Sequence, residues 1–139
     1  MEQLEDLRQI PVKTKEHLQV RNMDILCVPT NRVLDYVTTS GTLGNPVSFA
    51  LTKSDLERLA LSEYLSYETC GCDRDDILQL MVTNDRCFMA GLASLMGSFA
   101  YGSGITRVGN GIPELQWNII RQIHPTVLVC VPSFILKLI

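Results

Sequence analysis

Residues 38–46 read TTSGTLGNP and lie between two strand-like stretches, RVLDYV at residues 32–37 and VSFAL at residues 47–51. Gly41 and Gly44 permit a positive φ, so backbone N–H groups can turn toward an anion. Thr38, Thr39, Ser40 and Thr42 add hydroxyl groups beside those glycines. The stretch predicts either an ordinary hairpin turn, which composition alone favours, or a loop that holds phosphate.

The loop does not match the phosphate-binding pattern of P-loop nucleotidases. That pattern, G-x-x-x-x-G-K-[ST], requires a lysine followed by serine or threonine and opens directly into a helix. Residues 38–46 contain no lysine, and the residues after them read as a strand. A P-loop enzyme is therefore not expected.

Composition points to a globular chain without a nucleic-acid partner. The 139 residues contain 46% hydrophobic and 19% charged residues, and the net charge of −3 argues against nucleic-acid binding. The most apolar stretch, at residues 87–102, is shorter than the roughly 20 residues needed to cross a bilayer. No membrane partner is expected.

The cysteines indicate a reducing compartment. Their number is odd, five in all, and no C-x-x-C pair occurs, so free thiols in a cytoplasmic protein fit best. Cys70 and Cys72 are the closest pair, but neither histidine is near them in the sequence. We assign no residue to a metal.

The order of expected elements predicts an α/β fold with a partly parallel sheet flanked by helices. Residues 1–30 read as a helical lead-in, residues 31–52 as a hairpin around the loop, and residues 53–139 as a helix followed by strand–helix repeats. Repeated βαβ units imply parallel strands. A capping-box pattern at Thr52–Asp55 and a glycine stop at Gly71 mark the ends of the first helix. Residues 77–83 read as a strand that is apolar on both faces. Pro113 opens a later helix that carries Leu115, Ile119 and Ile123 on one face.

The loop resembles the phosphate loop of the adenylate-forming enzymes, whose usual form is close to [ST]-S-G-T-T-G-x-P. The matching positions are Thr39, Ser40, Gly41, Thr42, Gly44 and Pro46. Two positions depart from it, because Leu43 replaces a threonine and Asn45 replaces the usual lysine. Asparagine can still donate hydrogen bonds, so we expect weakened rather than absent ATP binding.

The resemblance extends to the phenylacetate–CoA ligase family. DLRQIPVKTKEHL at residues 6–18 looks like the lead-in of that family, and residues 88–138 are similar to its run from a glycine-rich helix to a strand end. Gly109, Asn110 and Gly111 hold the position of a glycine loop, and residues 131–134 hold the strand end. The similarity covers nearly the whole chain and implies part of the large N-terminal, AMP-binding domain.

The resemblance implies an ATP-dependent acid–CoA ligase. Such enzymes use ATP, Mg²⁺ and coenzyme A; an aromatic carboxylic acid such as phenylacetate attacks the α-phosphorus, and the acyl-adenylate then passes its acyl group to the thiol. The residues implied for the ATP phosphates are Thr39, Ser40, Gly41, Thr42, Gly44 and Asn45, and those implied for the acid pocket are Phe88, Gly91, Gly109, Asn110 and Gly111.

The resemblance also implies that this chain is one part of a longer enzyme. The family's adenine loop, ribose-binding aspartate and catalytic lysine are expected after residue 139, so no catalytic residue is assigned here. We expect the isolated chain to be inactive and, with an uncovered apolar helix, to form a homo-oligomer.

The identity of the acid is left open. Where the family has a tyr-gly-leu-phe segment that shapes the aryl pocket, this chain has Asp85-Arg86-Cys87-Phe88, and only the phenylalanine is kept. Asp85 and Arg86 are expected to form a solvated pair. The alternatives are an adenylyltransferase similar to coenzyme F390 synthetase and a non-catalytic binding or assembly module.

Overall fold

Three short strands form a parallel sheet in the computed structural model, which describes residues 4–40 and 45–139. Strand β3 (Ile77–Leu80) lies between β4 (Gly104–Arg107) and β5 (Val127–Val129). β3 is buried from its second residue onward, as expected for a central strand covered on both faces. The predicted α/β fold with a parallel sheet is confirmed.

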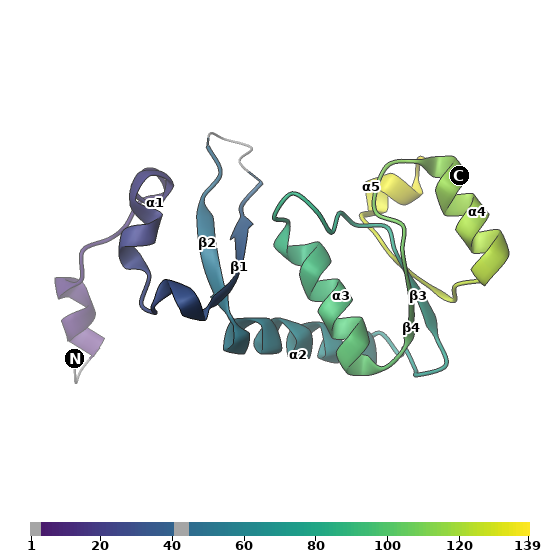
Figure 1. The fold of residues 1–139 in the computed structure, drawn as a ribbon, viewed down its shortest axis with the longest axis horizontal. Coiled ribbons are helices and arrows are strands. Elements are labelled where there is room, and N and C mark those ends of the chain that lie inside the picture. The colour runs from purple at the N-terminus through teal and green to yellow at the C-terminus, as the bar shows by residue number, and fades with distance from the viewer. Residues whose placement is uncertain (1–3, 41–44) are drawn as a thin grey trace.

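Helices cover both faces of this sheet (Figure 1). Helix α3 (Met89–Tyr101) connects β3 to β4, and α4 (Pro113–Ile123) connects β4 to β5 on the other side of β3. Because parallel crossovers are right-handed, connections that run in opposite directions place their helices on opposite faces. A short helix, α5 (Pro132–Ile135), follows β5.

Helix α2 (Lys53–Thr69) has the ends that the sequence predicts. Thr52 caps its first turn, and the Asp55 carboxylate accepts a hydrogen bond from the Thr52 backbone N–H at 2.8 Å, which completes the capping box. At the other end, Gly71 adopts φ +80° and Cys72 N–H donates to the carbonyl of Tyr67 at 3.0 Å. This Schellman arrangement stops the helix at the glycine.

Helices α2 and α3 pack closely because small residues line their contact. A Cβ on Gly97 would overlap the side chain of Glu63, so only glycine permits this approach. The hydroxyl of Tyr67 donates to the Ser94 carbonyl at 2.9 Å, and its ring packs edge-on against Tyr101. Together these contacts fix α3 between α2 and the sheet.

The hairpin is a separate two-stranded antiparallel sheet. It consists of β1 (Val33–Thr38) and β2 (Ser48–Thr52), with an irregular register near the start of β1. An isolated parallel bridge between Thr38 and Phe88 attaches the hairpin to the segment that precedes α3. The hairpin expected around the loop is therefore present, and it is tied to the parallel sheet.

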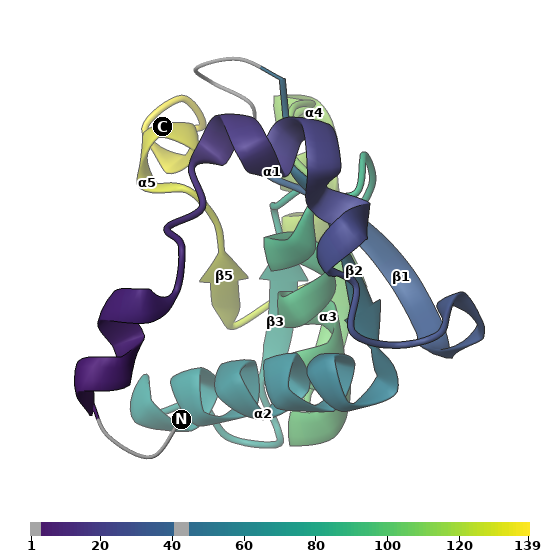
Figure 2. The ribbon, with the colours of Figure 1, turned by 90° about the vertical axis from the view of Figure 1, so that its left-hand side faces the viewer.

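The lead-in consists of short helices beside the hairpin (Figure 2). They are η1 (Leu4–Gln9), α1 (Lys15–Arg21), η2 (Asn22–Ile25) and η3 (Thr30–Arg32). The Gln19 side chain of α1 donates a hydrogen bond to the backbone carbonyl of Asn45, at the end of the loop. The lead-in therefore contacts the chain at Asn45, just before β2.

Helix α4 buries a polar residue beside the apolar face that the sequence predicts. On that face Ile119 is half-buried and Leu115 and Ile123 are 40% and 43% exposed, whereas Gln116 is buried. Gln116 lies against the sheet because the buried side chain of Gln79 donates to its Oε1 at 2.8 Å. A buried polar pair thus contributes to the orientation of this helix.

Neither a membrane-spanning helix nor a cluster of metal-binding side chains is found in the described ranges 4–40 and 45–139. Within them, no helix has the length and hydropathy needed to cross a membrane. Nor do they hold any group of three or more histidine, cysteine or acidic side chains placed to bind a metal ion.

Candidate functional site

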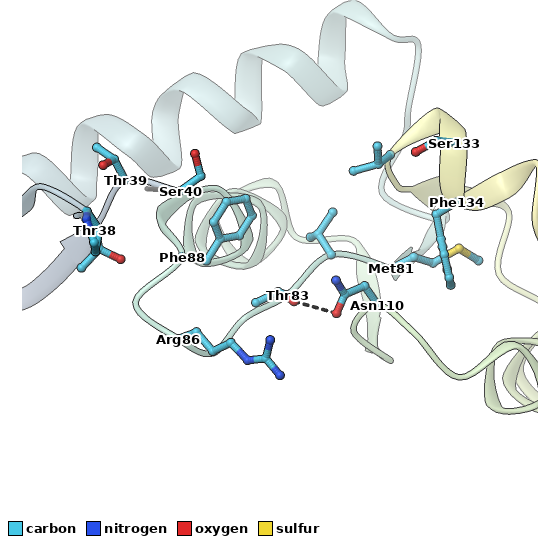
Figure 3. A pocket seen from close by; sticks show the side chains of 13 residues that line it. Thr38, Thr39, Ser40, Met81, Thr83, Arg86, Phe88, Asn110, Ser133 and Phe134 are labelled. Atoms are coloured by element: carbon cyan, nitrogen blue, oxygen red, sulfur yellow. Dashed lines mark hydrogen bonds between the residues drawn. The ribbon is translucent and has the colours of Figure 1, made fainter. Parts of the chain in front are cut away.

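A pocket of about 570 Å³ opens at one edge of the parallel sheet (Figure 3). Its walls come from the end of the hairpin and from the segments that follow β3, β4 and β5. The residues that line it are Thr38, Thr39, Ser40, Pro46, Met81, Val82, Thr83, Arg86, Phe88, Asn110, Val131, Ser133 and Phe134. Segments that are distant in the sequence therefore meet at one site.

The position of the pocket follows from the topology. In open α/β sheets, ligands bind outside the carboxyl ends of the strands, at the point where successive connections leave in opposite directions. That point lies between β3 and β5, because the chain passes from β3 to β4 and then crosses to the other side of β3. Met81 directly follows β3, and Val131 directly precedes α5, so both lie at this edge.

The hairpin reaches the pocket through a backbone hydrogen bond. The N–H of Thr38 donates to the carbonyl oxygen of Cys87 at 2.9 Å, beside the bridge between Thr38 and Phe88. This bond places the first residues of the loop next to the start of α3. The hydroxyl-bearing residues Thr39 and Ser40 consequently face the same cavity as Phe88.

Thr39 closes the base of the loop. Its backbone N–H donates to the carbonyl of Val47 at 3.0 Å, and its Oγ1 accepts from the Val47 N–H, also at 3.0 Å. Since Val47 is buried, this double link anchors the loop on the hairpin core. The Thr39 hydroxyl remains free to donate to a ligand, because a hydroxyl both donates and accepts.

The far wall of the pocket is held by side-chain hydrogen bonds between loops. The Thr83 hydroxyl donates to Oδ1 of Asn110 at 2.7 Å, which joins the segments after β3 and β4 (Figure 3). Behind them, Nε2 of Gln116 donates to the carbonyl of Gly109 at 2.8 Å. Gln116 is itself fixed by Gln79, so the position of Asn110 is set by the buried centre of the sheet.

Gly91 sets how closely α3 approaches the pocket wall without lining it. A Cβ at this position would overlap the backbone carbonyl oxygen of Thr83 and also meet the Asn84 side chain at 2.9 Å. The glycine lets the first turn of α3 lie against the segment that carries Thr83. Its role is therefore packing, one step removed from the cavity.

The pocket is apolar at its centre and weakly positive at its rim. Among its described lining residues, Arg86 is the only charged one. Helices α3 and α4 both start at this edge, and helix N-termini carry partial positive charge. The charge distribution favours a ligand with an apolar body and a negative end.

The groups with displaced pKa values do not line this pocket. Burial raises the pKa of the Tyr67 hydroxyl to about 12. The hydrogen bond from the Thr126 hydroxyl lowers the pKa of Asp76, at the opposite end of β3. These shifts belong to the packing of the fold.

The structure brings some of the sequence-predicted site residues together. Thr39, Ser40, Phe88 and Asn110 all line the pocket of about 570 Å³. Gly91 packs behind this pocket, and the carbonyl of Gly109 accepts a hydrogen bond from the Gln116 side chain. Gly111 and Asn45 are not among the residues that line the pocket. Gly41, Thr42 and Gly44 lie outside the described residues, so their assignment to phosphate remains a prediction.

Several lining residues were not assigned from the sequence. They are Thr38, Pro46, Met81, Val82, Thr83, Arg86, Val131, Ser133 and Phe134. Met81, Val82 and Thr83 directly follow the observed end of β3, although the sequence predicted a strand as far as residue 83. Because ligands gather at the carboxyl ends of such strands, that position was the signal that could have identified them.

Known proteins resemble this chain over nearly its whole length. It is 28% identical over 138 residues to the phenylacetate–coenzyme A ligase of Escherichia coli, covering 99% of this chain and 31% of that ligase. It is 30% identical over 132 residues to the Thermus thermophilus enzyme of the same name, covering 94% and 29%. The chain thus spans about a third of the length of these relatives, and no family model matches it.

Solved structures share the fold. An open conformation of 2-hydroxyisobutyryl-CoA ligase, in complex with 2-HIB-AMP and CoA, superposes with a TM-score of 0.80 at 19% identity, over 99% of this chain and 31% of that one. A fatty acid AMP ligase from Legionella pneumophila gives 0.59 at 12% identity, over 88% and 20%.

In sequence the chain is therefore phenylacetate–CoA ligase-like, over a length that corresponds to about a third of those enzymes. Its fold is that of part of the adenylate-forming ligases of known structure.

Proposed function

We propose that the pocket binds a carboxylic acid together with the phosphates of ATP, as part of an AMP-forming acid–CoA ligase. The observation that carries this proposal is the meeting of Thr39 and Ser40 with Phe88 and Asn110 in one cavity. The first two belong to the loop that resembles a phosphate loop, and the other two belong to the segments that resemble an acid pocket.

The loop side would hold the β- and γ-phosphates of ATP while the acid attacks the α-phosphorus. This task requires positioning and charge stabilisation, and hydrogen-bond donors fixed in advance perform it well. Ser40 is exposed at the cavity, and Thr39 is anchored by its double link to Val47. The N-terminal turn of α3 adds partial positive charge at the same edge.

Ligases of this type use ATP as its magnesium complex. The described residues, 4–40 and 45–139, contain no group of three or more histidine, cysteine or acidic side chains placed to hold a metal ion. The residues that we assign act on phosphate and on the acid.

The apolar side would hold the body of the acid. Met81, Val82, Phe88, Val131 and Phe134 supply a hydrophobic lining, and about 570 Å³ lies within the range of small-molecule pockets. The volume and the aromatic lining support an aromatic acid such as phenylacetate, the acid in the names of the relatives from E. coli and T. thermophilus. The reacting carboxylate would face the loop.

The experiment is a titration of the 139-residue chain with ATP–Mg²⁺ and with phenylacetate by isothermal calorimetry. We expect binding of both, at micromolar to millimolar dissociation constants, and we expect Ser40→Ala to weaken ATP binding while leaving phenylacetate binding unchanged. Ser48→Ala, an exposed serine of β2 that does not line the pocket, is the matched control. Absence of heat from both ligands would contradict the proposal.

Binding and turnover are separate questions for this chain. Since it spans about a third of its relatives' length, we expect pyrophosphate release from ATP and aromatic acids to stay at background. Clear acid-dependent pyrophosphate release by the chain would show that it holds a complete adenylation site.

We also expect self-association. Helix α4 and the segments around β5 expose large apolar side chains, among them Leu115, Trp117, Leu128 and Leu136. Exposed apolar surface of this kind promotes contact between chains. Light scattering that gives the mass of a monomer at high protein concentration would contradict this expectation.

A further inference from the structure

Arg86 occupies a backbone conformation that favours glycine. Its φ is +56°, and the next residue, Cys87, has the same value. The left-handed region is unfavourable for side chains with a Cβ, and strained residues of this kind cluster at ligand sites. Nothing in the packing of Arg86 explains an arginine here, because its side chain is 87% exposed.

The Arg86 side chain is available to bind a ligand. Its Nε lies 3.8 Å from Oδ2 of Asp85, which is too long for a hydrogen bond, and Asp85 is exposed as well. The guanidinium donors therefore have no fixed acceptor among the described residues. In Figure 3 the side chain extends along the wall formed by Thr83 and Asn110.

A second, more polar pocket adjoins the first at this wall. It has a volume of about 440 Å³ and shares Thr83, Arg86 and Asn110 with the larger pocket. Arg107, at the end of β4, also lines it and forms no ion pair with any residue in the described part of the chain. Two arginines against Asp85 give this second pocket a net positive charge.

We propose that Arg86 and Arg107 form an anion subsite that selects acids carrying a second negative group, at the end away from the reacting carboxylate. This inference rests on the proposed function, because it requires the acid's apolar body to lie in the larger pocket. The acid's far end then points across Thr83 and Asn110 into the second pocket. A guanidinium binds a carboxylate through charge-assisted hydrogen bonds, often two at once.

The test compares three acids that differ only at the far end of the ring: phenylacetate, 4-carboxyphenylacetate and its neutral amide, 4-carbamoylphenylacetate. Their affinities for the 139-residue chain are measured by calorimetry. We expect the dianion to bind about tenfold more tightly than phenylacetate, a difference of about 1.4 kcal/mol. 4-Carbamoylphenylacetate, whose only charge is its acetate carboxylate, should bind about as tightly as phenylacetate.

Two variants separate the effect of the Arg86 guanidinium from the effect of the left-handed backbone strain. Arg86→Gly removes the guanidinium and relieves the left-handed strain, so we expect it to abolish the preference for the dianion and to raise the melting temperature. Cys87→Gly relieves the same strain one residue later and keeps both arginines, so it should also raise the melting temperature but retain the preference. As a third variant, Arg107→Gln should reduce the preference without raising the melting temperature.

The outcomes distinguish the inference from the proposed function. If phenylacetate and the dianion bind equally, or if Arg86→Gly keeps the preference, the anion subsite is wrong while the acid pocket stands. If Arg86→Gly weakens ATP–Mg²⁺ and leaves the acids unchanged, the guanidinium serves phosphate and the subsite is again wrong. If none of the three acids binds, the acid pocket of the proposed function fails as well.

Discussion

The backbone N–H of Thr38 donates to the carbonyl oxygen of Cys87 across 2.9 Å, and this bond joins the hairpin to the parallel sheet. Thr38 is the last residue of β1, and Cys87 lies just before α3 in a left-handed conformation. Through this contact, the loop that resembles a phosphate loop meets the carboxyl edge of the sheet. The candidate site depends on it, because the pocket takes its walls from both sides.

Thr39 should contribute to both loop stability and ligand binding. Thr39→Val removes the oxygen that accepts from Val47 N–H, and we expect a loss of about 1 kcal/mol in the free energy of unfolding. ATP–Mg²⁺ should bind several-fold more weakly. Thr39→Ser keeps the hydroxyl and is the matched control. Denaturant unfolding and calorimetry measure the two effects; equal behaviour of the valine and serine variants would refute the assigned role.

Two glycine substitutions should differ in cost for separate physical reasons. Gly91→Ala places a Cβ onto the Thr83 carbonyl oxygen, and overpacking of this kind costs about 1–3 kcal/mol. Gly109→Ala meets no atom within 4 Å and is strained only by its φ of +73°, which costs about 1 kcal/mol.

Chemical denaturation of both alanine variants should therefore rank Gly91→Ala as the more destabilised. Because Thr83 lines the pocket, Gly91→Ala should also weaken binding of phenylacetate. A Gly109→Ala variant that is the less stable of the two would contradict the close approach of α3.

The buried glutamines should show strong coupling. Gln116→Leu removes the side-chain acceptor of Gln79 Nε2 and the donor to the carbonyl of Gly109, and leaves Gln79 Nε2 only its longer contact of 3.4 Å with the Gln116 backbone carbonyl. A buried polar group that loses its partner costs about 1–3 kcal/mol. Replacing both glutamines by leucine removes the donor along with its acceptor. The double variant should therefore be less destabilised than the sum of the two single variants, as a double-mutant cycle would measure. Simple additivity would show that the pair does not orient α4.

The capping box should make helix α2 sensitive to acid. Hydrogen bonds from the Thr52 hydroxyl and backbone N–H lower the pKa of Asp55 below its ordinary 3.8. Since the folded-state pKa is the lower one, the stabilisation is complete above about pH 4 and is lost as pH falls through the folded-state value. Asp55→Asn should thus be destabilising at pH 7 and nearly neutral at the acid end of the range.

Thermal melts of wild type, Asp55→Asn and Glu57→Gln across this pH range test the capping box. Glu57 lies on the same helix and pairs only with exposed Lys53 at 3.6 Å, so its substitution should have little effect at any pH. A cost of Asp55→Asn that does not change with pH would rule out the carboxylate as its source.

Local signals in the sequence predicted the elements well. The capping box at Thr52, the glycine stop at Gly71 and the proline at the start of α4 each fix the backbone within one turn, and each is present. The parallel sheet followed from the order of strands and helices. The burial of Gln116 in α4 could not be read in this way, because it depends on a hydrogen bond from Gln79, which is 37 residues earlier in the sequence.

The candidate site was only partly predictable for a related reason. Loop chemistry identified Thr39 and Ser40, and the resemblance added Phe88 and Asn110, all of which line the pocket. The solvated pair predicted for Asp85 and Arg86 is present, with both side chains exposed. The place of Arg86 between two cavities could not be predicted, because it arises from tertiary contacts. The glycines at 91, 109 and 111, assigned to the acid pocket by the resemblance, are not among its lining residues.

Backbone amide shifts of the ¹⁵N-labelled chain, followed by NMR during titration with ATP–Mg²⁺ and then with phenylacetate, test the central claim most directly. We expect ATP–Mg²⁺ to move the amide signals of Thr39 and Ser40, and phenylacetate to move those of Phe88 and Asn110, while Lys53–Thr69 of α2 stay unchanged. Both sets moving on one protein would place phosphate and acid in the same pocket. Shifts confined to other residues, or none with either ligand, would contradict it.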